Sequence, residues 1–165
     1  MILLVDGRSG SGKTTFACHL QGVLGWPVLH VEDMYPGWSG LAEASDLIAE
    51  SVLNPALPAE RRGFHRWDWY AYDFAEWVRT PSSASGSLIV EGCGALTKAN
   101  VAAARGIGDG EAWGVWLDLD REARRARALR RDPEFATHWE MWAEQENAHY
   151  SAHVPWELAD WIVRR

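Results

Sequence analysis

A glycine-rich segment near the start of the chain has residue types and a spacing that are suited to chemistry. Residues 7–15 read Gly-Arg-Ser-Gly-Ser-Gly-Lys-Thr-Thr and follow an apolar run, so they match the pattern G-x-x-x-x-G-K-T. In this pattern backbone N–H groups surround a phosphate, the lysine adds positive charge, and the hydroxyl after it reaches Mg²⁺. A helix N-terminus expected next favours an anion further. We therefore predict a phosphate loop that binds a nucleotide through Gly7, Arg8, Ser9, Gly10, Ser11, Gly12, Lys13, Thr14 and Thr15.

Carboxylates follow two of the other apolar runs. Glu32 and Asp33 come directly after one run, and Glu91 ends another. Because ligands of parallel sheets bind beyond the carboxyl ends of the strands, we expect these acids beside the phosphate loop. Mg²⁺ takes one or two carboxylates together with phosphates and water, and phosphoryl transfer needs a carboxylate that orients the acceptor hydroxyl. The acids are candidates for both roles, with solvated loop acids as the alternative.

Arginines recur in the charged segment 118–132. Arg124, Arg127 and Arg131 are spaced at i, i+3 and i+7, which places them on one face of a helix. Such a set, aimed at a nucleotide, would neutralise the charge that develops on the transferred phosphoryl group. The alternative is a solvated basic face near a helix C-terminus, where cations interact well with the helix dipole.

Aromatic residues are concentrated in residues 64–77 of a chain that has 11 tryptophans. Trp67, Tyr70, Phe74 and Trp77 recur at helical spacing, so we expect most of them to face the core.

The polar and aromatic residues between them are candidates for contact with a substrate. Trp69 and Tyr72 could stack on a base or sugar, and the pair Arg66 and Asp68 could bind hydroxyls or a phosphate. Asp68 could instead cap a helix N-terminus.

Apolar runs alternate with helical patterns along the chain, which is typical of an α/β protein with a parallel sheet. We expect strands at 2–5, 27–31, 88–91, 113–117 and 160–163, and helices at 13–24, 41–53, 69–79, 97–105, 120–131 and 134–149. Asp68, Thr97 and Asp120 are the expected N-caps. Because no repeat or long linker divides the chain, we expect residues 1–165 to form a single domain.

The overall composition argues against several classes of protein. A formal net charge of -7 argues against a sequence-independent nucleic-acid binder, which needs a basic surface. Cys18 and Cys93 show no metal-binding spacing and no disulfide framework, which favours a reducing cytoplasm. We expect no membrane partner, because no secretory leader pattern and no apolar run of about 18 residues occurs.

The segments described above resemble the uridine kinase/phosphoribulokinase-like group of P-loop small-molecule kinases. The resemblance lies in Gly7–Thr15, Val31–Tyr35, the strand ending Ile-Val-Glu-Gly at 89–92, and Asp118–Asp132. These are similar to the phosphate loop, the Asp-Ser-Phe-Tyr segment, the strand ending in Glu-Gly and the arginine-rich lid of that group. The resemblance implies a P-loop NTPase fold of three α/β/α layers, with a five-stranded parallel sheet and a helical lid at about 121–135.

The resemblance also implies roles for individual residues. Thr14, Glu91 and the acid of the Val31–Tyr35 segment would surround Mg²⁺, and that acid would also be the base. Alignment on Tyr35 places Glu32 at the acid position and Asp33 one residue later, so both stay candidates. Arg124, Arg127 and Arg131 would close over ATP. The chain has no clear counterparts of the nucleoside-binding segments of the group, so the resemblance implies no particular acceptor.

The sequence therefore predicts ATP- and Mg²⁺-dependent phosphoryl transfer to a hydroxyl of a small, nucleoside-like metabolite. The expected catalytic residues are Lys13, Glu32 or Asp33, Arg124, Arg127 and Arg131, and the expected metal ligands are Thr14, Glu91 and Glu32. The expected contacts with the acceptor are Asp33, Tyr35, Arg66, Asp68 and Trp69.

Two other functions and one partner stay open. In a nucleoside monophosphate kinase, Arg61, Arg62 and Arg66 would hold the phosphate of the acceptor. A regulatory module would bind ATP without transferring its phosphate, although such a module has no need of a lid. The Trp-rich surfaces would suit a homodimer as readily as a pocket.

Overall fold

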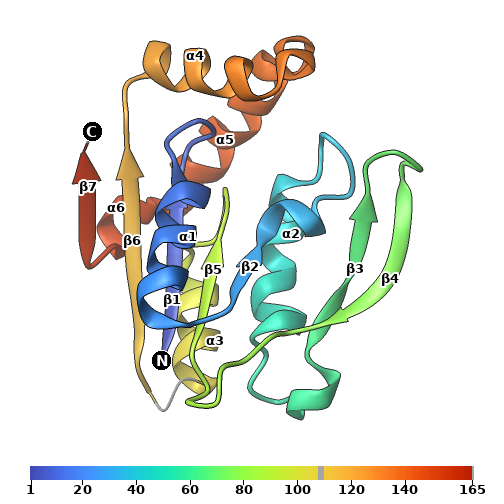
Figure 1. Cartoon of the computed structure of the whole chain (residues 1–165), viewed down its shortest axis with the longest axis vertical. Helices are drawn as coiled ribbons and strands as arrows, with labels where there is room; N and C mark the ends of the chain where they lie inside the picture. Colours follow the sequence, from blue (N-terminus) through green and yellow to red (C-terminus); the bar gives the residue numbers. More distant parts are fainter. Residues whose placement is uncertain (108–109, 165) are drawn as a thin grey trace.

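The computed structural model describes residues 1–107 and 110–164, and it contains a central parallel sheet of five strands (Figure 1). The strands lie in the order β2-β5-β1-β6-β7, and every neighbouring pair is parallel. Their bounds are β1 Ile2–Gly7, β2 Val28–His30, β5 Leu88–Glu91, β6 Ala112–Asp118 and β7 Trp161–Arg164. The structure confirms all five predicted strands and the predicted α/β class.

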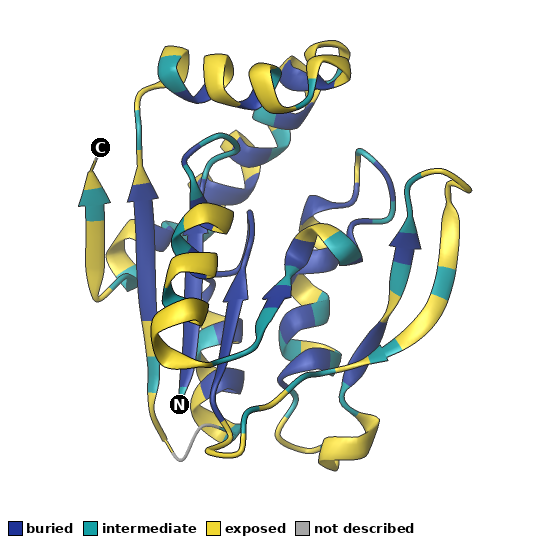
Figure 2. Ribbon diagram, viewed as in Figure 1, coloured by how far each residue is buried: buried dark blue, intermediate teal, exposed yellow. Residues whose placement is uncertain are grey.

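Helices cover both faces of this sheet, because alternate residues of its central strand point to opposite faces. Leu3 and Val5 pack with Ala17 of the first helix, whereas Ile2 and Leu4 join a larger cluster on the other face. The larger cluster includes side chains from the helices Leu41–Leu47, Lys98–Ile107 and Trp139–His153. Figure 2 shows the central strands buried between these layers. The predicted three-layer α/β/α architecture is confirmed.

The predicted helices 13–24, 41–53, 97–105 and 120–131 are found close to their expected ranges. The predicted helix 134–149 is shifted to Trp139–His153 behind a 3-10 turn, the short helix Pro155–Leu158 was not predicted, and the predicted helix 69–79 is treated below. Their bounds are α1 Lys13–Leu24, α2 Leu41–Leu47, α3 Lys98–Ile107, α4 Arg121–Arg131, α5 Trp139–His153 and α6 Pro155–Leu158. Short turns of 3-10 helix lie at η1 Val31–Met34, η3 Ala59–Arg61 and η4 Pro133–Thr137, and a π-helical turn, η2 Ile48–Val52, extends α2. Among the described residues, no helix has the length and apolar character that a membrane span requires.

Two of the three predicted helix caps are confirmed. The Asp120 carboxylate accepts the N–H of Ala123 at 2.9 Å at the start of α4, and the Thr97 hydroxyl accepts the N–H of Asn100 at 3.1 Å at the start of α3. Each side chain satisfies a backbone donor that has no partner within the first helical turn.

The predicted helix 69–79 is wrong, because this region forms an antiparallel hairpin. The hairpin consists of β3 Gly63–Asp68 and β4 Asp73–Arg79, joined by a turn. Asp68 caps no helix: its carboxylate accepts the N–H groups of Tyr70 and Ala71 and so shapes the turn. The spacing of the aromatic residues by three or four positions suggested a helix. Aromatic residues also favour strands, and this preference prevails here.

The expected burial of the aromatic residues in this segment is also wrong for three of the four. Trp67 is buried against Phe74 and Tyr72, but Tyr70, Phe74 and Trp77 are exposed. A two-stranded hairpin has no second layer of its own, so only the side chains that turn toward the main body lose contact with water. In Figure 2 the outer strand β4 is largely exposed.

Candidate active site

The loop between β1 and α1 presents unpaired backbone donors at the N-terminus of a helix. Gly10 and Gly12 adopt φ values of +81° and +95°, which residues with a Cβ rarely adopt. The N–H groups of residues 12–15 have no acceptor within the part of the chain that the structure describes. Donors converging at a helix N-terminus bind phosphates, so the geometry matches the predicted phosphate loop.

Lys13 is buried beside this loop, and its ammonium group is held in place. Its Nζ donates to the carbonyl of Arg8 at 3.3 Å and to the Cys93 Sγ at 3.3 Å. Burial alone would lower the pKa of Lys13, but Cys93 and the nearby carboxylates of Glu91 and Glu146 raise it overall. Lys13 is therefore charged at neutral pH and available to a phosphate.

Glu91 ends β5 with its carboxylate beside Thr14. The Thr14 hydroxyl donates to Glu91 Oε1 at 3.1 Å, and His30 Nδ1 lies 2.5 Å from the same oxygen. Two oxygens that bind one Mg²⁺ from neighbouring positions lie about 3 Å apart, because Mg–O bonds are about 2.1 Å long. Thr14 and Glu91 thus fit a magnesium ion that phosphate oxygens and water complete. The hydrogen bond that the imidazole donates to Glu91 raises the pKa of His30, and the protonated imidazole would compete with Mg²⁺ for this carboxylate oxygen.

Asp6 connects the phosphate loop to the turn that follows β5. Its buried carboxylate accepts the N–H groups of Gly94 and Leu96 and the hydroxyl of Tyr150, at 3.2, 2.9 and 2.8 Å. Burial raises the pKa of Asp6 to about 6. The hydrogen bonds hold the turn with Glu91 and Cys93 at a set distance from the loop.

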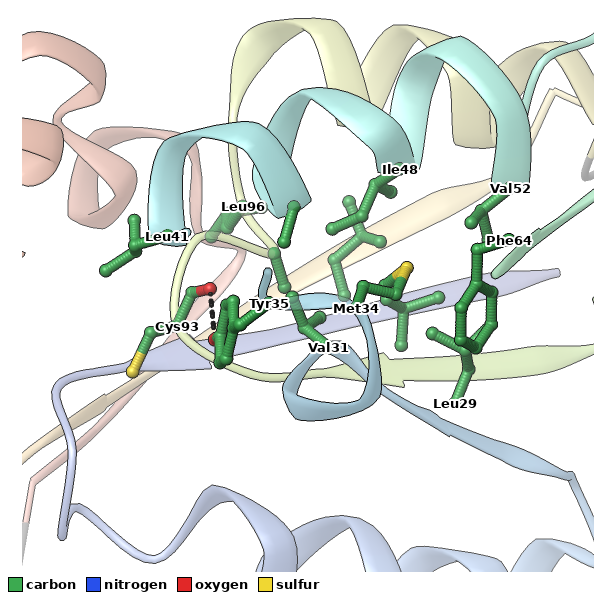
Figure 3. Packing of buried hydrophobic residues seen from close by; sticks show 14 of the residues in the cluster. Leu29, Val31, Met34, Tyr35, Leu41, Ile48, Val52, Phe64, Cys93 and Leu96 are labelled. Atoms are coloured by element: carbon green, nitrogen blue, oxygen red, sulfur yellow. Dashed lines mark hydrogen bonds between the residues drawn. The ribbon is translucent and has the colours of Figure 1, made fainter. Parts of the chain in front are cut away.

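A cleft of about 1160 Å³ opens in front of these groups. Glu32 lines it, whereas Asp33 is half-buried outside the lining, and burial raises the pKa of its carboxyl. Tyr35 also lines the cleft and donates its hydroxyl to the Cys93 carbonyl at 2.8 Å (Figure 3). Of the two acids that the sequence left open, Glu32 is the one that faces the cleft.

Aromatic rings from four segments form the far wall of the cleft. The Trp38 indole stacks on His138 at a centroid distance of 4.1 Å and on Phe135 at 5.4 Å. It also lies 5.0 Å from Trp69 of the hairpin turn and 6.4 Å from Trp142 of α5. The wall can therefore pack against a planar or apolar part of an acceptor.

The arginines of α4 divide into two groups. Arg127 and Arg131 line the cleft together with Arg130, in the helix that crosses above the phosphate loop (Figure 1). Arg124 does not line it: its Nη1 donates to the Ser9 carbonyl at 3.2 Å and its Nε to the Leu119 carbonyl at 3.0 Å. The three arginines share a helix face, but their side chains do not all point into the cleft. The two backbone carbonyls hold the buried Arg124 side chain against the loop.

Of the acceptor contacts expected in the hairpin, Trp69 and Tyr72 line the cleft, whereas Arg66 and Asp68 do not. Arg66 forms a two-pronged ion pair with Glu76 of the neighbouring strand, at 2.8 and 3.2 Å, and Asp68 is used in the turn. Both side chains therefore form their contacts within the hairpin that stands where a helix was predicted.

Several residues of the site were missed in the sequence, and some of them carried a signal. Asp6 and His30 are polar residues at the ends of apolar strands, and Cys93 lies between two glycines just after Glu91. Glu146 gave no such signal, because it belongs to an ordinary helical pattern far from the loop that it contacts.

No family model matches this sequence, and no curated protein matches it. Solved structures do resemble it. A structure described as a possible uridine kinase from Bacillus stearothermophilus superposes with a TM-score of 0.61 at 16% identity, over 98% of this chain and 87% of that chain. This chain has the fold of the P-loop kinases.

Two further structures support the same fold. Shikimate kinase from Acinetobacter baumannii, in complex with shikimate, gives a TM-score of 0.53 at 15% identity, over 99% of this chain and 83% of that chain. An uncharacterized protein from Eubacterium ventriosum ATCC 27560 gives 0.51 at 12% identity, over 99% and 87%. At these identities the likeness concerns the arrangement of strands and helices.

Proposed function

We propose that this protein is a small-molecule kinase that transfers the γ-phosphoryl group of ATP to a hydroxyl of a nucleoside-like metabolite. The observation that supports it is the meeting of three kinds of group at one cleft: a buried lysine beside a phosphate loop, a hydroxyl–carboxylate pair that fits Mg²⁺, and a free carboxylate on the acceptor side. Phosphoryl transfer needs positioning and charge neutralisation more than it needs covalent chemistry.

In the proposed reaction, the phosphate loop and Lys13 hold the β- and γ-phosphates. Thr14 and Glu91 would hold Mg²⁺, which neutralises charge on the phosphate oxygens. Glu32 orients the acceptor hydroxyl and takes its proton as the oxygen attacks the γ-phosphorus. The bond to the β-phosphate oxygen breaks and ADP leaves. Arg127 and Arg131 stabilise the negative charge of the transferring group.

The acceptor side of the cleft favours an uncharged acceptor over a nucleoside monophosphate. Arg66 is paired with Glu76, and Arg62 donates to the carbonyls of Asn54 and Leu57 at 2.9 and 3.0 Å. Neither arginine lines the cleft. The arginines that line it all belong to α4, and we assign them to ATP.

The test is ADP release with Mg-ATP across a panel of nucleosides, nucleoside monophosphates, sugars and hydroxy acids. We expect one strong hit among uncharged, ring-bearing alcohols. Turnover with a monophosphate alone would favour the nucleoside monophosphate kinase. Binding of Mg-ATP without turnover on any acceptor would favour a regulatory module instead.

A further inference from the structure

The backbone of Ser9, near the start of the phosphate loop, is held on both sides by buried charged side chains. Its N–H donates to Glu146 Oε1 at 2.6 Å, and its carbonyl accepts from Arg124 Nη1 at 3.2 Å. Glu146 belongs to α5 and is 1% exposed, and Arg124 belongs to α4 and is 7% exposed. Two helices far along the chain therefore hold the two peptide groups that flank one residue of the loop.

The two charged side chains also belong to one cluster behind the loop. Glu146 Oε2 lies 3.5 Å from Arg8 Nη1 and 4.0 Å from Arg124 Nη1, while its other oxygen lies 3.4 Å from the Cys93 Sγ. A buried carboxylate needs such partners, because it has lost its hydration. The cluster thus joins the loop, the turn after β5, and the helix that carries Arg127 and Arg131.

We propose that Glu146 is a positioning residue, which sets the phosphate loop for nucleotide binding through the Ser9 backbone and Arg124. This inference rests on the proposed function, because it concerns how the same loop holds phosphates. Fixing Ser9 before the nucleotide arrives lowers the cost of ordering the loop on binding. Glu146 itself does not line the cleft, so it acts through the groups that it holds.

If Glu146 acted through its charge alone, its removal would strengthen nucleotide binding. Glu146 is a negative charge close to the position of bound phosphates, so removing it makes the site more positive and attracts an anion more strongly. A positioning role predicts weaker binding in spite of this added attraction. The sign of the change in affinity therefore separates the two roles.

The experiment measures dissociation constants for Mg-ATP and for inorganic tripolyphosphate by calorimetry, in the wild type, Glu146→Gln and Arg124→Gln. Glu140→Gln is the matched control, since Glu140 lies on the same helix and pairs with the exposed Arg121. We expect about tenfold weaker binding of both ligands to Glu146→Gln and Arg124→Gln, and a change below twofold in the control. The double variant should be no weaker than either single variant, because both side chains act on the backbone of one residue.

Folding is checked by circular dichroism and by thermal unfolding. If a single variant does not fold, the double variant replaces it, because removing both charges leaves no lone buried charge between them. Hydrogen exchange of the wild type gives an independent measurement: the Ser9 amide should exchange more slowly than the free amides of residues 12–15.

Several results would overturn the inference. A folded Glu146→Gln variant that binds Mg-ATP as tightly as the wild type, or more tightly, excludes a positioning role. A fall in unfolding temperature with no change in affinity shows a purely structural role. Rapid exchange of the Ser9 amide contradicts the hydrogen bond to Glu146. If the wild type itself binds neither ligand, the proposed function fails instead.

Discussion

Substitution of Gly10 by alanine tests how closely α4 is packed on the phosphate loop. An added Cβ at Gly10 would lie 2.8 Å from the carbonyl carbon and 2.9 Å from the Cα of Arg124, and closer still to its carbonyl oxygen. These are backbone atoms of a helix, so the clash cannot be relieved by rotating a side chain. The φ of +81° is also unfavourable for alanine. Either α4 or the loop must move.

The expected cost follows from these two effects. A residue with a Cβ in a sparsely populated backbone region costs about 1–3 kcal/mol, and overpacking costs a similar amount. We expect Gly10→Ala to lower the free energy of unfolding by about 3 kcal/mol. Gly22 is the matched control, because it lies within α1 and an added Cβ would meet nothing within 4 Å. Gly22→Ala should raise stability by about 0.5–1 kcal/mol.

The assay is equilibrium unfolding in urea for both variants, followed by Mg-ATP binding for those that fold. Gly10→Ala should also bind Mg-ATP more weakly, since the displaced loop no longer presents its N–H groups as a set. A free energy of unfolding within about 0.5 kcal/mol of the wild type would refute the close packing of α4 on Gly10.

Three further predictions concern charge. Lys13→Ala should lower turnover at least about 10²-fold while the circular dichroism spectrum stays native, because a preorganised charge on the phosphates is lost; near-normal turnover would contradict the phosphate-loop assignment. Glu32→Gln should slow transfer about 10²-fold and Asp33→Asn much less, since only Glu32 lines the cleft; wild-type rates in both variants would exclude an acid at this position. Burial, aided by His153, lowers the pKa of His149 from 6.5 to about 4, so the native state binds this proton less well than the unfolded chain. Stability present above about pH 6.5 should therefore be lost as the pH falls toward 4, and urea unfolding of His149→Gln should show a weaker dependence on pH over this range.

Local patterns in the sequence were enough to predict the frame of the protein. The phosphate loop is a continuous segment whose glycines, lysine and threonine act within a few residues of one another. Each strand of the parallel sheet is a short apolar run, because both faces are covered by helices. Helix starts at Asp120 and Thr97 could also be predicted locally, because a capping side chain bonds to a backbone N–H only three residues away.

Contacts between distant segments decided the rest. The segment 69–79 of the hairpin was predicted as a helix, because aromatic spacing suits either structure and only pairing between β3 and β4 selects one. That pairing also places Arg66 beside Glu76, so the Arg66 side chain does not line the cleft. Glu146 reaches a loop residue 137 positions earlier in the chain.

The direction of Arg124 shows the same limit most clearly. Its spacing from Arg127 and Arg131 predicts a shared face of α4, but backbone carbonyls of Ser9 and Leu119 hold its guanidinium beneath the helix. Sequence patterns report which face of an element a residue occupies. Where a long charged side chain ends depends on the acceptors that the folded chain brings within its reach, and these come from tertiary structure.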